Sequence, residues 1–455
     1  MGLLTQAKID RDFTGGIYLP PLGKAPPLDR LESVDYRGPL RLPLCRGSGS
    51  PMHLSLQPGQ KVATDAVLAC GDDGQCLYAP RAGVVGPLAA AWVDHQPRQP
   101  VITLLPPAEE DPYRPAAGPE SPGTNPFVSL AAAQSQLQRK QKVLEAIFQT
   151  GIVDSATGRL FAFTLEKLAS AQIQTVVANA VPLEYEINTP LALLHHFPEQ
   201  IFAGLAILKT WLGADQALMA YPHYFPIDKT TARQWQVQCV PVSEKYPQGT
   251  GPSVLGTLRK QGVLKRKHRP AAAAVFSIQI LRQIERTVLA GHKSLDRIIT
   301  VCGDGVARPR HFLAPVGMPL MDLLHAAQLQ EHAQCVARKS SLTGEPINPE
   351  YAVITPLSEA FIVLQQVVHP QPQRCIRCGR CIEYCPARID PARLLHLAET
   401  GRFAQAVRMG VYSCVECGLC SYLCPSHLRI MANICMIKSH ASPAPSAPPQ
   451  QEEPA

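Results

Sequence analysis

The sequence lacks any run of about 18 uninterrupted apolar residues, so no ordinary transmembrane helix is expected. Its first residues, MGLLTQAKIDRDF, lack the apolar stretch of a secretory signal, and Gln6 stands where a myristoylation signal has Ser or Thr. Charged residues make up 17% of the chain and hydrophobic residues 46%, which excludes a disordered protein. We therefore expect a folded, cytosolic protein whose 455 residues form several domains.

Cysteine, by contrast, is abundant, with 15 in the chain. In a reducing compartment this number predicts metal binding or catalysis rather than disulfides. Eight of the cysteines fall in two segments of identical spacing, CIRCGRCIEYCP from Cys375 and CVECGLCSYLCP from Cys414. The others show no ligand spacing and are expected to be small core residues: Cys45, Cys70, Cys76, Cys239, Cys302, Cys335 and Cys435.

Each cysteine segment has the form C-x2-C-x2-C-x3-C-P, which is typical of proteins with two [4Fe-4S] clusters. Three thiolates of one segment bind one cluster, and the cysteine before the proline binds the other. The spacing predicts one cluster on Cys375, Cys378, Cys381 and Cys424, and a second on Cys414, Cys417, Cys420 and Cys385. Structural zinc is the alternative, but zinc sites use C-x2-C pairs rather than triplets. Gly379 and Gly418 would let backbone N–H groups approach sulfur.

The stretch between the two cysteine segments predicts helices. Asp390 can cap a helix that has Pro391 at its first position, and Gly401 suits its C-terminal end. A second short helix is expected over residues 402–409. The cluster domain is therefore expected to be helical.

Residues 36–104 alternate short apolar runs with turn signals such as PG, DDG and RAG, which is typical of a compact β-sandwich. The order of these runs resembles the biotinyl/lipoyl barrel-sandwich fold. The expected tip of its central hairpin, CGDDGQC, has no lysine to carry biotin or lipoate. We therefore expect a structural role for this domain.

The middle of the chain predicts an α/β domain with a largely parallel sheet, because helical patterns flank a buried strand at VVANAV. The basic run RKQGVLKRKHRP, from Arg259, is expected to be a solvated loop, with an acidic partner or an anionic membrane surface as the alternative. It lacks interleaved aromatic residues, so nucleic acid is not an expected partner.

The strings CIRCGRCIEYCPARIDPARLL and CVECGLCSYLCPSHL resemble the C subunit of Rnf-type electron-transport complexes. FTGGIYLPP, KYPQG, TVCGDGVARP and VGMPLMDLL extend the resemblance over nearly the whole chain. The fold class implied is multidomain α+β. The expected parts are a barrel-sandwich domain (1–104), a linker (105–130), an α/β domain like the flavin subunit of respiratory complex I (131–285), an SLBB (β-grasp-like) domain (286–340), a helical ferredoxin-type domain with two [4Fe-4S] clusters (365–438) and a disordered tail (439–455).

The family resemblance also implies an FMN and NADH site on a glycine-rich loop. The corresponding stretch, GIVDSATGRLFAFTLEKL, keeps Gly151 and Gly158 but places Asp154 where a phosphate would lie. The next motif, NAVPLEYE, keeps Asn179 and Glu184 and has lost an acid. These features have changed while the cluster ligands are intact, which argues against FMN or NADH binding.

The resemblance implies an electron-transfer subunit with no catalytic acid, base or nucleophile, peripheral at the cytoplasmic face of the bacterial inner membrane. It would relay electrons between NADH, ferredoxin or flavodoxin and membrane subunits that carry flavin. NADH dehydrogenase activity of its own would require the altered nucleotide site to work. Two alternatives remain: a soluble iron–sulfur and flavin reductase of the cobalamin-reductase type, and a binding scaffold that clusters merely hold together.

Overall fold

The computed structural model describes residues 13–21, 23–44, 52–72, 74, 76–93, 96–106, 140–154, 160–264, 273–293, 295–368 and 370–441. Cys45, Gly158, most of the expected linker, half of the basic run and most of the expected C-terminal tail lie outside the described residues. The chain divides into two compact units. The large unit contains Leu19–Val367, and the cysteine unit contains Phe13–Tyr18 together with the chain from Val368.

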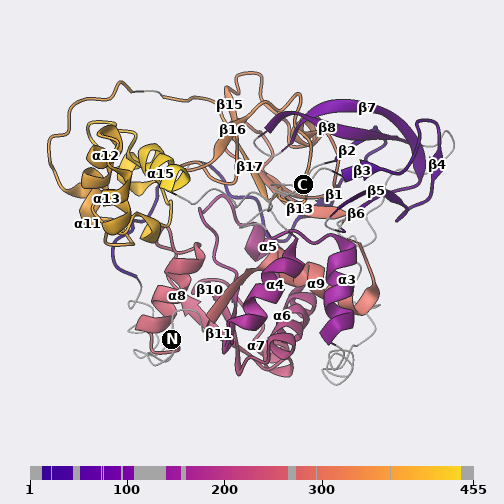
Figure 1. Cartoon of the computed structure of the whole chain (residues 1–455), viewed down its shortest axis with the longest axis horizontal. Helices are drawn as coiled ribbons and strands as arrows, with labels where there is room; N and C mark the ends of the chain where they lie inside the picture. The colour runs from indigo at the N-terminus through magenta and orange to yellow at the C-terminus, as the bar shows by residue number, and fades with distance from the viewer. Residues whose placement is uncertain are drawn as a thin grey trace, which may run out of the picture. The chain divides into compact units, whose positions relative to one another are not determined.

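Two small antiparallel sheets come first in the large unit (Figure 1). The four-stranded sheet has the order β2 (Leu40–Pro43), β8 (Gln96–Leu105), β7 (Gly83–Val93) and β4 (Lys61–Val62). The three-stranded sheet has the order β3 (Met52–Leu54), β5 (Val67–Gly71) and β6 (Cys76–Tyr78). Met52, Ala69 and Leu77 are buried, so one face of the three-stranded sheet contributes to the core.

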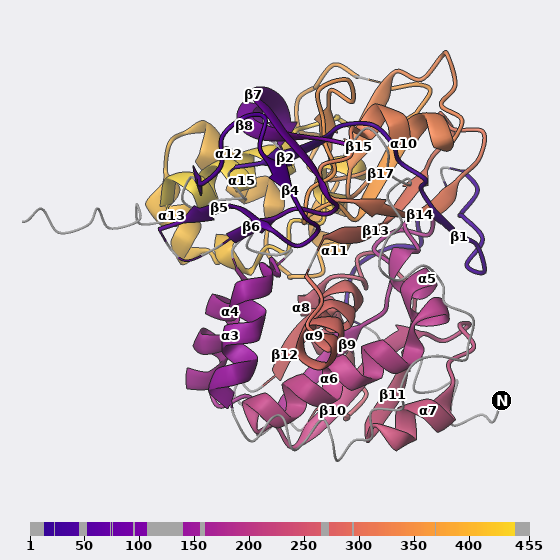
Figure 2. The same ribbon diagram turned by 90° about the vertical axis from the view of Figure 1, so that its right-hand side faces the viewer.

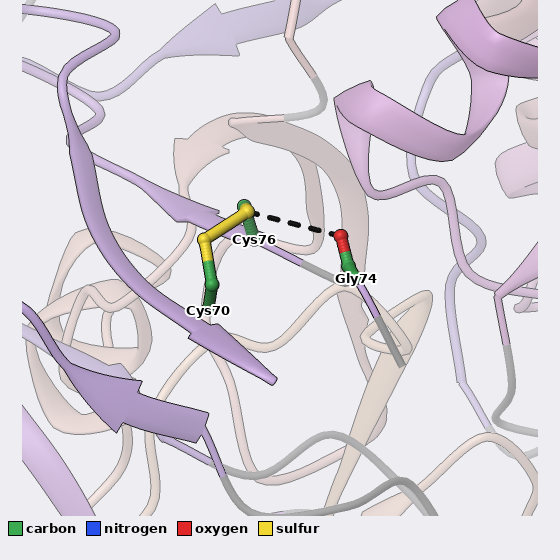
Figure 3. The surroundings of a disulfide bond; sticks show 3 residues. All are labelled: Cys70, Gly74 and Cys76. Atoms are coloured by element: carbon green, nitrogen blue, oxygen red, sulfur yellow. Dashed lines mark hydrogen bonds between the residues drawn. A yellow bond between two sulfur atoms is a disulfide. The ribbon is translucent and has the colours of Figure 1, made fainter. Parts of the chain in front are cut away.

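The hairpin formed by β5 and β6 corrects one expectation from the sequence. Cys70 and Cys76 are not small core residues, because they form a disulfide between neighbouring strands (Figure 3). Both cysteines are only partly buried. The expectation that the chain makes no disulfides was therefore wrong for this pair. The spacing did not reveal it, because only the hairpin register brings the two residues opposite each other.

A four-stranded parallel sheet forms the middle of the large unit, with the order β11 (Val237–Val242), β10 (Gln216–Pro222), β9 (Thr175–Asn179) and β12 (Ala273–Ser277). The expected strand at VVANAV is β9, and four of its five residues are buried. Its side chains alternate between two hydrophobic clusters, with Val176 and Ala178 in one and Val177 in the other. The sheet is therefore covered on both faces, as a parallel sheet requires.

Helices supply the two covering layers. They are α3 (Lys140–Thr150), α4 (Phe161–Ser170), α5 (Thr189–His196), α6 (Pro198–Leu212), α7 (Lys229–Gln234), α8 (Gly251–Lys260) and α9 (Ile278–Ala290). Helices α6 and α9 pack side by side (Figure 2), while α8 covers the other face. In the part of the chain that the structure describes, no single helix is long and apolar enough to span a membrane; α5 and α6, joined at a 99° bend, pass that test only as a pair.

A six-stranded mixed sheet completes the large unit. Its order is β1 (Leu31–Ser33), β14 (Arg310–Pro315), β13 (Asp296–Cys302), β17 (Ala360–Leu364), β15 (Cys335–Arg338) and β16 (Glu345–Ile347), with α10 (Leu320–Ala326) beside it. The range 286–340, expected to form an SLBB domain, supplies β13, β14, β15 and α10, and the other strands come from outside it. Leu42 of β2 and Phe312 of β14 belong to one hydrophobic cluster, so this sheet shares a core with the antiparallel sheets.

The cysteine unit is helical, as the sequence predicts. It contains α11 (Arg380–Glu383), α12 (Pro391–Glu399), α13 (Phe403–Arg408), a 3-10 turn η2 (Val411–Ser413), α14 (Leu419–Tyr422) and α15 (Ile430–Ala441). Asp390 caps α12 as expected, since its carboxylate accepts a hydrogen bond from the Arg393 backbone N–H at 2.9 Å. Leu394 of α12 and Ile434 of α15 are fully buried in the core of this unit.

Candidate metal centre

The two cysteine segments have the same unusual backbone conformation. Arg377 and Glu416, each two residues after the first cysteine of its segment, have φ of 56° and 55°. Both backbone N–H groups donate to the preceding cysteine Sγ, at 3.4 Å in each case. Gly379 and Gly418 follow with φ of 77° and 75°. A left-handed conformation at non-glycine residues costs free energy and concentrates at functional sites. Each segment therefore forms the same turn, in which a backbone N–H group donates to a cysteine Sγ.

Four thiols line a cavity of about 750 Å³ on the cysteine unit. Three come from the first segment and the fourth from the second: Cys375, Cys378, Cys381 and Cys424. Cys375 and Cys378 are exposed, and Ile376 and Ile382 on the rim are also exposed. The structure thus brings together the residues expected for the first cluster, and places them at the protein surface.

A second, much smaller cavity of about 20 Å³ lies at the other cysteines. It is lined by Cys385 from the first segment together with Cys414, Cys417 and Cys420, and Cys381 also borders it. Met431 and Ile434 of α15 close over it. Burial raises the pKa of the Cys417 thiol to about 11 and that of Cys420 to about 12. These thiols are protonated at neutral pH without metal, so metal binding must release protons.

The donor set suits an iron–sulfur group. All eight residues are cysteines, and thiolates are the ligands that hold [4Fe-4S] clusters. Within the described ranges, no three His, Cys, Asp or Glu side chains converge closely enough to hold a single metal ion. The eight thiols instead line two cavities, four at the first and the other four, together with Cys381, at the second, and each segment contributes its last cysteine to the cavity of the other.

A short segment from the N-terminal part of the chain supports the end of the first cysteine segment. The Gly16 N–H donates to the Tyr384 carbonyl at 2.9 Å, and Arg388 donates to the Thr14 hydroxyl at 2.8 Å. Gly15 has φ of 77°, and a Cβ there would lie 2.8 Å from the Cys385 carbonyl carbon. Only glycine fits this close approach. In the sequence this segment, FTGGIY, showed only a family likeness, and nothing local linked it to the cysteines.

The two cavities differ in charge. Arg374, Arg377 and Arg380 line the first cavity, are all exposed, and outnumber the acidic residues Asp390 and Glu399 that also line it. The second segment has Glu416 and Leu419 at the positions of Arg377 and Arg380. Lys438 of α15 neutralises Glu416, with its Nζ 2.5 Å from Oε1, and also donates to the Cys414 carbonyl at 2.8 Å. The exposed cavity therefore has a basic rim, and the smaller one does not.

The residues expected to retain parts of a nucleotide site have protein partners in this structure. The Asn179 amide donates to the Gly249 carbonyl at 2.7 Å. The buried Glu184 carboxylate accepts hydrogen bonds from the hydroxyl groups of Ser340 and Ser341, at 2.5 Å each, and from the Ser341 N–H at 3.0 Å. Gly151 directly follows α3, a helix that packs against α9.

Asp154, at the start of the altered glycine loop, has a partner in α4. The Asp154 carboxylate is buried and accepts a hydrogen bond from the Thr164 hydroxyl of α4 at 2.9 Å. A buried carboxylate at this place would repel a phosphate group. The structure therefore pairs Asn179 and Glu184 with other residues of the large unit.

Comparison with known proteins supports the chemistry of the cysteine unit. Residues 368–425 match the 4Fe-4S dicluster domain family. This range includes all eight cysteines that line the two cavities. The C-terminal part of the chain is therefore an iron–sulfur domain.

Most of the chain is similar to curated proteins that are named as the C subunit of an ion-translocating oxidoreductase complex. The protein of that name from Yersinia enterocolitica serotype O:8 / biotype 1B (strain NCTC 13174 / 8081) is 25% identical over 417 residues, which cover 86% of this chain and 56% of the relative. The protein of that name from Cronobacter sakazakii (strain ATCC BAA-894) is 24% identical over 402 residues, which cover 84% of this chain and 49% of the relative. The chain thus spans about half the length of these relatives.

Among solved structures, the crystal structure of an NAD+-reducing [NiFe]-hydrogenase in the H2-reduced state matches with a TM-score of 0.46 and 16% identity. The match covers 68% of this chain and 64% of the other. A likeness of this size does not define the fold.

Proposed function

We propose that this chain is an electron-transfer subunit that holds two [4Fe-4S] clusters in an Rnf-like oxidoreductase complex. The observation that supports the proposal most strongly is that eight thiols from both segments line two cavities, with Cys381 bordering both. The match to a dicluster domain and the similarity to the C subunits of ion-translocating oxidoreductase complexes support it. No side chain need act as acid, base or nucleophile in this role.

Each bound cluster would supply a site that takes up and releases one electron. The protein contributes the ligands and their surroundings. The backbone N–H groups of Arg377 and Glu416 point at Sγ atoms, and such hydrogen bonds stabilise negative charge on sulfur and raise the reduction potential. The positive charge of the basic rim also raises the reduction potential, but only at the exposed site. We propose that the exposed site has the higher potential of the two.

The exchange of Cys385 and Cys424 between the segments would hold the two clusters close together. Cys381 borders both cavities, which supports a short path between the two sites. Electrons can therefore pass from one site to the other without movement of the chain.

The donor is proposed to be a protein rather than NADH. The Glu184 carboxylate already accepts hydrogen bonds from serine, and the Asp154 carboxylate accepts one from threonine. A flavodoxin-like or ferredoxin-like protein, or another subunit of the same complex, would then exchange electrons directly with the cysteine unit.

Peripheral association with the cytoplasmic face of a bacterial inner membrane through those subunits is part of the proposal. We also propose that the large unit contains the barrel-sandwich domain, the complex I-like α/β domain and the SLBB domain expected from the sequence. Co-purification with membranes separates this account from a soluble reductase.

The basic rim predicts that the electron partner is acidic at its contact surface, because opposite charges accelerate encounter. The variant Arg377→Glu/Arg380→Glu should slow reduction of an acidic flavodoxin at low ionic strength by about tenfold or more, and the difference should shrink as salt is added. Stopped-flow absorbance of the reduced protein mixed with oxidised flavodoxin measures this rate.

The control is Arg402→Glu/Arg408→Glu, which makes the same change in charge away from the rim. Arg402 immediately precedes α13 and Arg408 is its last residue, and both are exposed. Both variants should retain the iron content of the wild type. Equal rates for the two variants would show that the rim does not guide the partner, and would leave the assignment of the clusters intact.

A further inference from the structure

The disulfide of the large unit belongs to a row of three reactive side chains. In the three-stranded sheet, His53 of β3 lies directly opposite Cys70 of β5, and Cys70 lies directly opposite Cys76 of β6. Residues directly opposite on neighbouring antiparallel strands project from the same face, with Cβ atoms about 5 Å apart. The imidazole, the first sulfur and the second sulfur therefore follow one another across that face.

This face of the sheet is open to solvent around His53, whereas Tyr78, two residues after Cys76, is buried. The side chain of His53 is 71% exposed, and both cysteines are only partly buried. Asp72, just after β5, places its carboxylate 3.4 Å from the His53 imidazole Nε2. The pair of sulfur atoms thus has an accessible imidazole on one side, which is itself oriented by a carboxylate.

The second sulfur has a different neighbour. Sγ of Cys76 lies 3.8 Å from the carbonyl oxygen of Gly74 in the turn (Figure 3). A carbonyl oxygen accepts a hydrogen bond from a protonated thiol, but it cannot donate a hydrogen bond to a thiolate. Gly74 packs closely against Phe148 of α3, because a Cβ at Gly74 would lie 2.7 Å from the Phe148 ring. The two cysteines are therefore inequivalent: the surroundings of Cys70 favour a thiolate, and those of Cys76 a thiol.

A purely stabilising disulfide is a poor explanation for this position. The two cysteines are separated by six positions in neighbouring strands that already pair as a hairpin. A disulfide stabilises a fold mainly by restricting the unfolded chain, and a short loop gives the smallest effect. Exposed disulfides are also the ones that exchange readily with thiols.

We propose that Cys70 and Cys76 form a thiol–disulfide exchange site, with His53 beside the nucleophilic Cys70, and that its substrates are dithiols and disulfides. This proposal does not rest on the function proposed for the cysteine unit.

Exchange with a dithiol proceeds in two steps. A thiolate of the substrate attacks Sγ of Cys70, the bond between Cys70 and Cys76 breaks, and Cys76 leaves and takes up a proton beside the Gly74 carbonyl. The second substrate thiol then attacks the substrate sulfur of the mixed disulfide and releases the Cys70 thiolate next to His53. The substrate leaves as a disulfide, and the protein has gained two electrons and one proton on Cys76; a second proton from the substrate thiols is taken up by the Cys70 thiolate or by the His53 imidazole beside it. The reverse reaction oxidises the protein and reduces a substrate disulfide.

The test uses the anaerobic protein with its metal content as purified, equilibrated with mixtures of reduced and oxidised dithiothreitol. Acid quenching, differential alkylation and peptide mass spectrometry give the fraction of Cys70–Cys76 disulfide over time. We expect the pair to change from disulfide to dithiol as the ratio is varied. In His53→Gln, the approach to equilibrium should be about tenfold slower, because less Cys70 is present as thiolate. His332→Gln, at an exposed histidine elsewhere in the large unit, should behave as the wild type.

Single-cysteine variants test which sulfur is the nucleophile. Cys76→Ser should form a mixed disulfide with oxidised glutathione about tenfold faster than Cys70→Ser, because Cys70 is the sulfur next to the imidazole. A pair that stays oxidised, or stays reduced, at every ratio would overturn the proposal, as would equal rates for His53→Gln and the wild type. Visible absorbance of the iron–sulfur domain should be the same in all of these variants, so the outcome does not depend on the cluster proposal.

Discussion

Alanine at Cys385 should remove the same cluster as alanine at Cys414, although the two residues belong to different segments. Cys385 lines the small cavity together with the three cysteines of the second segment. The wild type should contain about eight iron atoms per chain, and each single variant about four, because one [4Fe-4S] cluster loses a ligand. Chemical analysis of iron and acid-labile sulfide measures this directly.

Double variants distinguish crossed from uncrossed ligands. Cys385→Ala/Cys414→Ala should keep about four iron atoms, because both changes affect one cluster, whereas Cys385→Ala/Cys375→Ala should keep almost none. If Cys385→Ala/Cys375→Ala instead keeps about four iron atoms and Cys385→Ala/Cys414→Ala almost none, each segment binds its own cluster. Cys435→Ala is the control, since this half-buried cysteine of α15 lines neither cavity. Circular dichroism shows which variants retain the helices, and iron is compared among those.

NADH should leave the visible absorbance of the anaerobic protein unchanged, while dithionite should bleach it. The physical reason lies at the places where a flavin and a nicotinamide would be held. All the acceptor capacity of Glu184 faces Ser340 and Ser341, and Asp154 places a buried carboxylate in the altered glycine loop. Without a flavin, two-electron oxidation of NADH cannot be split into the single electrons that clusters accept.

The measurement is an absorbance spectrum before and after each reductant, together with the flavin released on denaturation. We expect no stoichiometric FMN. One FMN per chain, with bleaching by NADH alone, would contradict this part of the account and would make the chain an NADH-oxidising subunit. The assignment of the eight cysteines would be unaffected.

Features fixed by neighbouring residues could be predicted from the sequence. The spacing of the cysteines predicted which of them line each cavity, although their role as ligands stays a prediction. Asp390 with Pro391 predicted the start of α12, because a capping signal lies within one turn of the helix that it begins. The strand at VVANAV followed from its β-branched residues and its length. Each of these is a local preference that the tertiary structure did not override.

Features that depend on residues far apart in the sequence could not be predicted. Glu184 meets Ser340 at a sequence separation of 156, and Thr14 meets Arg388 at a separation of 374. The disulfide required knowledge of the hairpin register, since only direct pairing of Cys70 with Cys76 brings their side chains together. In each case the partner was visible in the sequence, but nothing near it specified the contact.

The central claim is that the cysteine unit carries two clusters that accept electrons reversibly. Anaerobic titration with dithionite, followed by reoxidation, tests it most directly. The account predicts that the cluster absorbance is bleached by about two electrons per chain, one for each cluster and apart from those that reduce the Cys70–Cys76 disulfide, and that the spectrum recovers fully on reoxidation. A protein that contains zinc and takes up no electrons, or one that loses its absorbance irreversibly on the first reduction, would contradict it.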